Sequence, residues 1–528
     1  MSGLTHLRLE NFRCFKDSGY VPIKPITIFV GRNSSGKSSF LRTLPLLRQS
    51  VESNTKGPVL WYGNYVDFGT FEDIKSFSGE DNQTVILSFK FDEPILRSRQ
   101  NALSRRTKFP DGHSKNSSIG VSIGLTGDKN KTEAKSLKID INRNTVEFEL
   151  KNERVVNFRI NNIDYMEHFG TIRISFKKGL IPEFLEELED EFIDDDGENH
   201  RITYLEKCKF EEKFRQVAIL SLGKHFHKNT SRDTIKTSIN RVNLYQTDEH
   251  IQNVLYLTNR TQKKFTKNLK NNGDEIIKDF KHFSFCLNIE AILNDVEKHL
   301  KSYFMSVKYL GPIRAVAERY YRHQDLQVSE VDHTGSNLPM VLKSLARHHT
   351  KNFTKWTNDN FGFSVKVAEV GQHYALKVTT TEDSQEYNIT DMGFGFSQLL
   401  PIIASLWLNG VQSHPFLREQ SYFVLEQPEL HLHPALQAKL ADAFCQITNL
   451  TKGHSSEQSS YRIILETHSK AIVDAIGDNI ASGKISSDDV SLVFFEKRQG
   501  QDTNVQLAEY DEGGYLKNWP IGFFSGRA

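Results

Sequence analysis

The stretch Ile26-Thr27-Ile28-Phe29-Val30 runs directly into Gly31-Arg32-Asn33-Ser34-Ser35-Gly36-Lys37-Ser38-Ser39. Its first five residues are β-branched or aromatic, which predicts a buried strand. Residues 31–38 fit the pattern G-x-x-x-x-G-K-[ST], in which backbone N–H groups of a loop face phosphate oxygens at the start of a helix. In this pattern Lys37 reaches the β- and γ-phosphates and Ser38 gives a hydroxyl to Mg²⁺. The stretch therefore predicts a nucleotide site with ATP and Mg²⁺ as ligands.

Two later apolar runs also end in polar residues. Tyr422-Phe423-Val424-Leu425 leads into Glu426-Gln427-Pro428-Glu429, and Ile463-Ile464-Leu465 leads into Glu466-Thr467-His468-Ser469. Both runs predict buried strands. A carboxylate at the end of the first strand is the expected second group on the metal side of a phosphate loop, so Glu426 is predicted to bind Mg²⁺ with Ser38. His468, at the end of a third core strand, is predicted to sense the γ-phosphate.

A glycine-rich turn precedes the longest apolar run of the chain. Asp391-Met392-Gly393-Phe394-Gly395-Phe396-Ser397-Gln398 leads into the apolar residues 399–408. Glycines and a serine at a helix start predict a second anion cradle, and a plain helix cap is the alternative. The apolar run is far shorter than the ~20 residues that span a bilayer, so we expect no membrane association.

The rest of the chain is organised around these motifs. Alternating segments such as Val85-Ile86-Leu87-Ser88-Phe89 recur between about 84 and 175 and predict an antiparallel meander. From about 180 to 300 the pattern indicates charged helices, and strands and helices alternate again from 303. We therefore expect an α/β fold in which the core, residues 1–91 and 303–528, is split by a β-rich insertion (92–180) and a charged helical insertion (181–302).

Composition excludes several classes of protein. The 528 residues carry 67 Lys and Arg against 66 Asp and Glu, which excludes a globally basic nucleic-acid coat protein. Any DNA contact would need a local patch, for which the candidates are Arg97, Arg99, Arg105, Arg106 and Lys108. The four cysteines are scattered, which excludes a disulfide framework or a cysteine zinc site. Without a secretory signal in residues 1–15, the expected location is the cytoplasm.

The order and spacing of these motifs resemble ATP-binding-cassette-type P-loop ATPases of the branch that includes chromosome-maintenance and DNA-repair ATPases. Within it, the sequence resembles the overcoming-lysogenisation-defect type, particularly ATPase subunits of bacterial antiphage systems of the PARIS, Septu and retron types. The stretches that carry the resemblance are residues 31–39, 46–50 with 57–71, 309–314, 426–434 and 466–469.

The resemblance implies a head-to-head homodimer, or a higher homo-oligomer, that sandwiches ATP between its ATPase heads. Gly395 and Ser397 would then act on the ATP held by the other subunit. It further implies a sensor or scaffold that controls a separate nuclease effector, of Toprim or HNH type, in response to a phage-encoded trigger.

One departure from the family pattern affects the chemistry. Gln427 stands where the catalytic glutamate is usual, and an amide cannot act as a general base at neutral pH, so it can only orient a water. Either Glu429 substitutes for the base or hydrolysis is slow, and we expect slow hydrolysis.

Two other functions compete with a separate-effector ATPase. A nuclease in its own right is disfavoured, because only about 60 residues follow His468. A DNA-clamping repair or recombination ATPase is the alternative that stays open, although the neutral net charge does not favour it.

Overall fold

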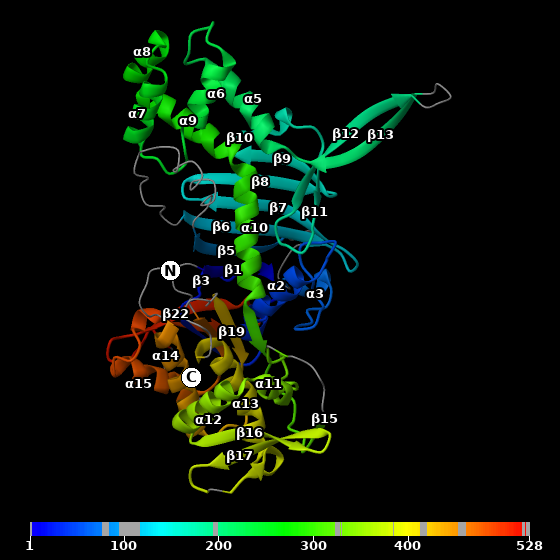
Figure 1. Cartoon of the computed structure of the whole chain (residues 1–528), viewed down its shortest axis with the longest axis vertical. Helices are drawn as coiled ribbons and strands as arrows, with labels where there is room; N and C mark the ends of the chain where they lie inside the picture. The colour runs from blue at the N-terminus through cyan, green and yellow to red at the C-terminus, as the bar shows by residue number, and fades with distance from the viewer. Residues whose placement is uncertain are drawn as a thin grey trace.

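The computed structural model describes residues 3–76, 84–93, 117–193, 199–322, 328, 330–383, 385–411, 420–451, 461–519 and 523. The molecule is elongated, with the core sheet toward one end, a helical arm at the other and an inserted sheet between them (Figure 1). The candidate DNA patch between Arg97 and Lys108 lies outside the described residues. The four cysteines are free and buried.

The core is a seven-stranded sheet that contains both halves of the chain. Five strands are parallel, β14 (Val307–Leu310), β19 (Ser421–Glu426), β20 (Tyr461–Glu466), β4 (Ile26–Gly31) and β21 (Val490–Glu496), and β22 (Asn504–Tyr510) and β23 (Leu516–Lys517) continue the sheet antiparallel. The N-terminal β4 lies between β20 and β21. The predicted split α/β core is therefore confirmed.

Strand β4 is buried on both faces. Phe29 packs with Phe40 and Phe495 on the face covered by α1 (Lys37–Leu41) and α2 (Thr43–Glu52). The centroid of the Phe29 ring lies 5.4 Å from the centroid of each of the other two rings. Ile28 and Val30 pack in the opposite cluster, with α13 (Phe394–Leu406), α14 (Pro434–Thr451) and α15 (Lys470–Ala481). Burial on both faces explains the continuous apolar run that predicted this strand.

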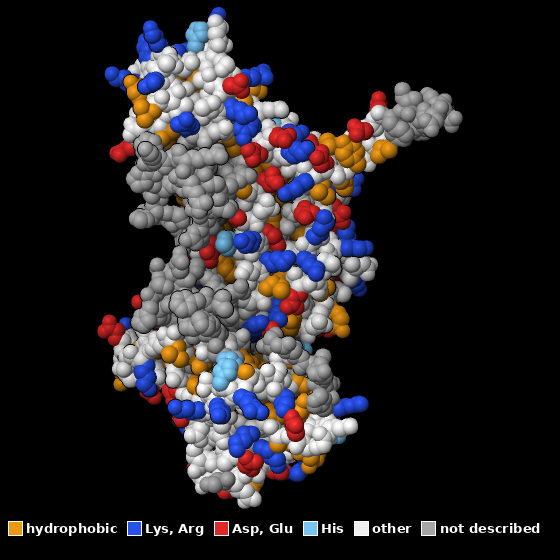
Figure 2. All heavy atoms as spheres, viewed as in Figure 1, with side chains coloured by type: hydrophobic (Ala, Val, Ile, Leu, Met, Phe, Trp, Pro, Cys, Tyr) orange, Lys and Arg blue, Asp and Glu red, His pale blue; other side chains and the backbone are white. Residues whose placement is uncertain are grey.

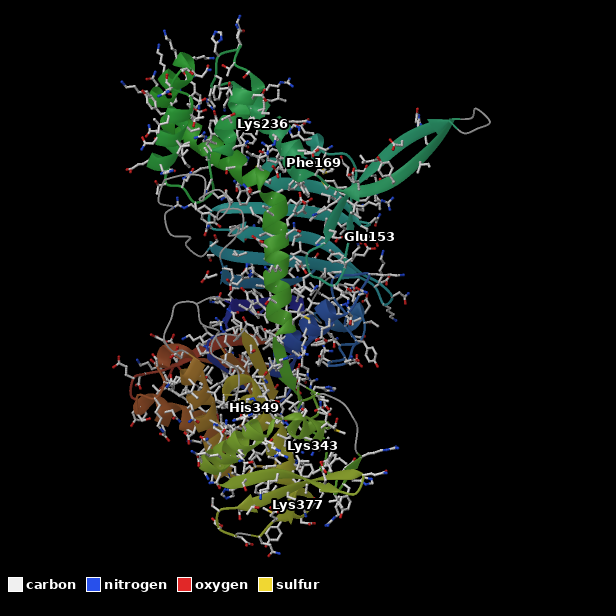
Figure 3. The ribbon with its side chains drawn as sticks, in the orientation of Figure 1. Glu153, Phe169, Lys236, Lys343, His349 and Lys377 are labelled. Carbon is white, nitrogen blue, oxygen red and sulfur yellow. The ribbon has the colours of Figure 1, made fainter. Side chains whose placement is uncertain are left out.

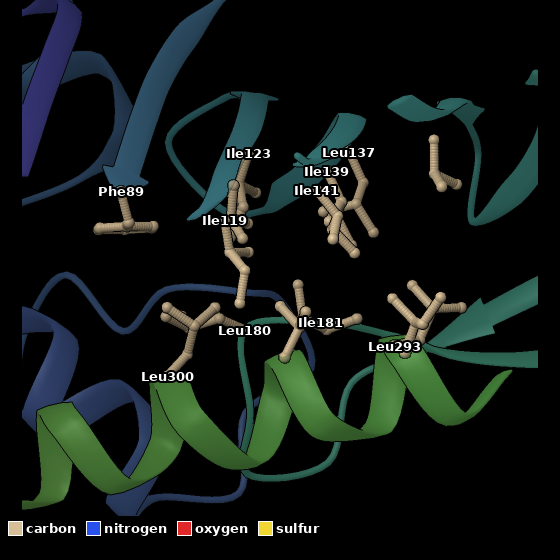
Figure 4. Close-up of a cluster of buried hydrophobic side chains, with 14 of the residues drawn as sticks. Phe89, Ile119, Ile123, Leu137, Ile139, Ile141, Leu180, Ile181, Leu293 and Leu300 are labelled. Carbon is tan, nitrogen blue, oxygen red and sulfur yellow. The ribbon is translucent and has the colours of Figure 1, made fainter. Parts of the chain in front are cut away.

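A second, twelve-stranded antiparallel sheet forms the β-rich insertion and includes the chain's first strand. Its order is β13 (Asn199–Lys207), β12 (Glu183–Ile193), β11 (Ile172–Ser175), β9 (Arg154–Ile160), β8 (Asn144–Lys151), β7 (Thr132–Ile141), β6 (Ser117–Gly127), β5 (Val85–Glu93), β1 (Leu4–Phe12) and β2 (Phe15–Asp17), with β10 (Ile163–Asp164) on β9 and β3 (Val21–Pro22) on β1. The long helix α10 (Ile289–Met305) crosses one face, and Figure 4 shows its Leu293 and Leu300 directed toward the sheet. The predicted meander is confirmed.

The helices expected from about residue 180 begin later than predicted. Residues of β12 and β13 instead pair as a long hairpin that projects from the molecule (Figure 1). Residues 201–207 are exposed, and the many charged residues of the hairpin resemble those of a solvated helix. The helical arm follows, with α5 (Phe210–Gly223), α6 (Arg232–Asn240), α7 (Asp248–Thr258), α8 (Lys263–Asn271) and α9 (Gly273–Leu287).

A small sheet lies at the end opposite the arm, as Figure 3 shows by the positions of Lys236 on α6 and Lys377 on β17. It contains β15 (Tyr321–Arg322), β17 (His373–Thr380), β16 (Phe363–Val370) and β18 (Tyr387–Asn388), next to α11 (Leu338–Ser344) and α12 (Arg347–Phe361). Short elements complete the described chain, namely α3 (Phe71–Ile74), the 3-10 turns Met166–His168, Ile389–Asp391 and Ser487–Asp489, and a π turn at Trp407–Val411.

Within the described residues, one helical segment passes a test of length and apolar composition for crossing a membrane. It is Phe394–Val411, and 67 % of it is buried inside the protein. Its residues pack in the same cluster as β4 and β20, which is the position of a core helix.

Candidate functional site

The phosphate-loop residues lie between β4 and α1, as predicted. At Gly36, where φ is 97°, a Cβ would lie 2.4 Å from Cys14 Sγ. At Gly31 a Cβ would lie 2.4 Å from the carbonyl oxygen of Phe495. Both positions therefore need glycine, because a side chain would collide with neighbouring strands or loops. The loop is fixed further by Thr503, whose hydroxyl donates to the Ser35 carbonyl at 3.0 Å.

A cavity of about 600 Å³ opens over this loop. Its volume falls within the roughly 300–1,000 Å³ of small-molecule sites. The predicted site residues that line it are Asn33, Ser34, Ser35, Gly36, Lys37, Ser38, Ser39, Gln427 and His468, and the other lining residues are Glu466, Arg13, Cys14, Asp73 and Lys497. The parallel strands β4, β19 and β20 bring these segments to one edge of the sheet. This is the usual place for a ligand in an open α/β sheet.

Lys37 is buried rather than solvated. Its Nζ donates to the Arg32 carbonyl at 2.9 Å and lies 3.8 Å from Oε1 of Glu466, and both side chains are 3 % exposed. Burial lowers the pKa of Lys37, against the neighbouring charges of Glu466 and Glu429. Burial raises the pKa of Glu466, against the Ser38 hydroxyl and the Lys37 charge. The two groups form a coupled pair at the floor of the cavity.

Glu466 is the site residue that sequence reasoning missed. In the segment 466–469, the sequence pattern indicated a functional role for His468. Glu466 pairs in register with Glu426 of the neighbouring strand, so both carboxylates come to the same sheet edge. Glu466 could have been found from its position, because it is a polar residue directly after a buried apolar run. Glu426 was identified from the same pattern.

Glu426 is held by other protein groups and does not line the cavity. Arg42 donates to both of its oxygens, at 2.7 and 2.8 Å, and the Tyr309 hydroxyl donates to Oε1 at 2.7 Å. Its side chain is 2 % exposed. The predicted metal role of Glu426 stays a prediction.

Gln427, Glu429 and His468 are linked by backbone hydrogen bonds. Gln427 has φ 42°, in the left-handed region that residues other than glycine adopt uncommonly, and its N–H donates to the Glu466 carbonyl at 2.9 Å. Oε1 of Glu429 accepts the His468 N–H at 2.7 Å, so this carboxylate holds the backbone of His468 and does not line the cavity. Burial and the Lys37 charge lower the pKa of His468, which favours a neutral imidazole.

The glycine-rich segment forms the N-cap and first turn of α13, and it lies outside the cavity of its own chain. The hydroxyl of Ser397 donates to the Phe394 carbonyl at 2.6 Å, and Ser397 is buried. At Gly395 a Cβ would lie 2.8 Å from the His431 carbonyl, so the turn packs closely on the segment after β19. Phe394 remains 43 % exposed, its ring edge-on to His431 with centroids 4.7 Å apart.

The cavity fits a magnesium nucleotide. Ser35 Oγ and Glu466 Oε2 are buried without a hydrogen-bond partner among the described residues. The described chain contains no group of three or more His, Cys, Asp or Glu side chains that could hold a metal. Mg²⁺ usually binds through one or two protein oxygens together with substrate phosphates, so Ser38 and a carboxylate suffice when the nucleotide supplies the remaining ligands.

Comparison with solved structures gives the following similarities. A crystal structure of an SMC head bound to the C-winged helix domain of ScpA is 10 % identical, with TM-score 0.36, covering 97 % of this chain and 98 % of that one. The SMC head domain from Thermotoga maritima is 9 % identical, with TM-score 0.36, covering 96 % and 98 %. A Pyrococcus furiosus Smc head domain with an extended coiled coil, bound to the C-terminal domain of ScpA, is 11 % identical, with TM-score 0.34, covering 96 % and 97 %.

Comparison with curated proteins finds no match. Residues 485–525 match a family described as a protein of unknown function (DUF3696). Residues 3–473 match the family described as an AAA ATPase domain, a match that includes the phosphate loop, β19, β20 and His468. The chain therefore belongs to the AAA ATPase domain family.

Proposed function

We propose that this ATPase binds ATP with Mg²⁺ in the cavity over residues 31–39 and hydrolyses it slowly, as a switch. The observation that carries the proposal is the cavity itself, where Lys37, Ser38 and Glu466 meet below a glycine-dependent loop. Backbone N–H groups and Lys37 would hold the phosphates, and bound Mg²⁺ would neutralise charge on the β- and γ-phosphates.

We expect slow hydrolysis because of the side chains that are placed to activate a water in the cavity. Gln427 can orient a water but cannot take its proton. Glu426 is engaged by Arg42 and Tyr309. Glu429 accepts the His468 N–H with Oε1 and does not line the cavity. Glu466 is the acidic side chain closest to Lys37 and Ser38, and both already interact with it. A switch benefits from slow turnover, because it must persist in one state until a trigger arrives.

The switch would operate through contact between two ATPase heads. We propose a homodimer, or a higher homo-oligomer, in which the turn at Gly395 and Ser397 meets the nucleotide of another copy. Exposed apolar side chains adjoin this turn, since Phe394, Ile313 and Val316 are 43 %, 84 % and 65 % exposed. Gln398 of α13 donates to the Arg314 carbonyl at 3.5 Å, which places the segment 313–316 next to the turn. Apolar residues that are costly to expose are typical of an interface.

In the cell, the proposed role is a cytoplasmic sensor or scaffold in a bacterial antiphage system. The ATPase would control a separate Toprim- or HNH-type nuclease and respond to a phage-encoded trigger. The motif resemblance supports this role, and the insertions 92–180 and 181–302 would provide surface for such partners. The exposed Ile202, Tyr204 and Leu205 on the projecting hairpin are an example of that surface.

The DNA-clamping alternative rests on a local basic patch. On the face shown in Figure 2, Lys and Arg side chains are interspersed with Asp and Glu over the inserted sheet. ATPase activity that rises with added DNA, in the absence of any protein partner, would favour this alternative over the antiphage role. Copurification of the natively expressed chain with proteins encoded beside it would identify an effector.

The dimer is tested by light scattering with and without a non-hydrolysable ATP analogue. Wild type is expected to double its mass with the analogue. Phe394→Asp should bind the analogue and remain a monomer, because a charge would be buried in the interface. Tyr256→Asp, which changes an exposed aromatic residue on α7 in the distant arm, is the matched control and should still dimerise. Dimerisation of Phe394→Asp at the wild-type concentration would contradict the proposed interface.

A further inference from the structure

Two glutamates end neighbouring strands of the core sheet at the same level. Glu426 closes β19 and Glu466 closes β20, and they are direct register partners. Both carboxylates are almost fully buried, at 2 % and 3 % exposed. Their contacts differ, and the difference separates a structural carboxylate from one that is available to a ligand.

Glu426 has its hydrogen-bonding capacity engaged within the protein. Arg42 grips both oxygens in a two-pronged contact, and Tyr309 adds a third donor. A carboxylate in such a pair would have to release the guanidinium before it could bind a cation. The Arg42 charge would also repel a metal placed beside it.

Glu466 faces the cavity with one oxygen unused. Oε1 lies 3.8 Å from Lys37 Nζ, and Glu466 lines the cavity together with Ser38. Oε2 is buried without a hydrogen-bond partner among the residues that the structure describes. A buried carboxylate oxygen that lacks a partner is costly unless a ligand completes it. Ser38 is the hydroxyl that the phosphate-loop pattern assigns to Mg²⁺, and it lines the same cavity as Glu466.

We propose that Glu466 on β20, and not Glu426 on β19, is the carboxylate that holds Mg²⁺ together with Ser38 in this site. Glu426 is instead a structural anchor that ties the junction of α1 and α2, through Arg42, and β14, through Tyr309, to β19. The Ser38 hydroxyl and the Glu466 carboxylate would hold Mg²⁺ directly or through its water. The inference deepens the proposed function and rests on the nucleotide site being real.

The two strand ends allow a matched pair of variants. Glu466→Gln and Glu426→Gln each remove one carboxylate charge and keep side-chain size. The probe is Mn²⁺ in place of Mg²⁺, titrated with a non-hydrolysable ATP analogue and followed by the electron paramagnetic resonance signal of free Mn²⁺. This readout measures metal binding and does not depend on turnover.

Glu466→Gln should weaken Mn²⁺ binding in the nucleotide complex by at least the roughly 10–100-fold seen when supporting groups of metal sites are removed. Analogue binding in EDTA should survive, because the backbone N–H groups and Lys37 remain. Glu466→Asp, which restores the charge on a shorter side chain, should recover part of the affinity. Glu426→Gln should bind Mn²⁺ within a few-fold of wild type.

The opposite pattern, loss of Mn²⁺ in Glu426→Gln and retention in Glu466→Gln, would overturn the assignment. If Glu426→Gln does not fold, the double variant Arg42→Met/Glu426→Met removes both charges of the pair and takes its place. A wild-type chain that binds no analogue at all would refute the proposed nucleotide site itself. Normal analogue binding with Mn²⁺ affinity indifferent to Glu466 would refute the metal assignment alone.

Discussion

Removing Arg42 should destabilise the protein more than removing the charge of its partner Glu426. The reason is unequal burial, because Glu426 is 2 % exposed and Arg42 is 37 % exposed. In Arg42→Met a buried carboxylate keeps only the Tyr309 hydroxyl, at 2.7 Å. Breaking a buried pair in this way costs about 3–5 kcal/mol, and the remaining bond and nearby solvent reduce the expected loss to about 3 kcal/mol.

In Glu426→Gln the group that loses its charged partner belongs to a side chain that is 37 % exposed. A cation on a partly exposed side chain costs less to leave unpaired than a buried carboxylate, so we expect a loss of about 1 kcal/mol, most of it from weakened hydrogen bonds. Replacing both residues with methionine removes the buried charge altogether and should recover most of the stability lost in Arg42→Met.

Denaturant unfolding of the three variants, followed by tryptophan fluorescence and circular dichroism, measures these differences. Comparing midpoints under one set of conditions avoids assigning an absolute free energy to a chain with several structural units. A smaller loss for Arg42→Met than for Glu426→Gln would refute the argument from burial. If the double variant has no higher unfolding midpoint than Arg42→Met, the two residues do not form an energetically independent pair.

Three further predictions test other parts of the structure. Gln427→Glu should speed ATP hydrolysis in a phosphate-release assay, since it places a carboxylate at the cavity; unchanged or slower turnover would remove Gln427 from the account of slow hydrolysis. Gly36→Ala should abolish nucleotide binding and lower the unfolding midpoint, because its Cβ would lie 2.4 Å from Cys14 Sγ; wild-type nucleotide affinity would contradict this. Glu297 has its pKa raised by burial to about 7, so the folded state retains a proton that the unfolded chain loses near pH 4.5. Stability should therefore fall by about 2–3 kcal/mol as pH rises from about 4.5 to 7, and Glu297→Gln should flatten that slope in denaturant midpoints; an unchanged slope would exclude Glu297 as its source.

The parts of the fold that follow from local pattern were predictable from the sequence. Residues 26–31 are buried on both faces, so the sequence of this strand is an almost unbroken apolar run. Glycine is required at 31 and 36 because a Cβ at either position would lie 2.4 Å from a neighbouring atom. The meander was equally visible, because its strands have one face packed under α10 and therefore alternate. The family match over residues 3–473 agrees with the ATPase predicted from these motifs.

What the sequence could not provide is the pairing of distant side chains. Arg42 lies 384 positions from Glu426, and nothing in the sequence around it indicates that it binds a carboxylate at the end of a distant strand. The register that places Glu466 beside Glu426 depends on strand order, which local pattern does not encode. The projecting hairpin of β12 and β13 was missed for a related reason, since its pairing is between strands and its charged, largely exposed residues resemble a charged helix.

The central claim is that the cavity over residues 31–39 is a nucleotide site in which Lys37 contacts the phosphates. Isothermal titration with a non-hydrolysable ATP analogue tests it on wild type, Lys37→Ala and Lys497→Ala, the last a matched control at an exposed position of the same cavity. A charged hydrogen bond contributes about 1.5–3 kcal/mol, so Lys37→Ala should weaken binding by roughly 10–150-fold, and more because Glu466 would then face the phosphates unpaired. Lys497→Ala should bind within a few-fold of wild type. Equal affinity of wild type and a correctly folded Lys37→Ala, checked by circular dichroism, would contradict the account.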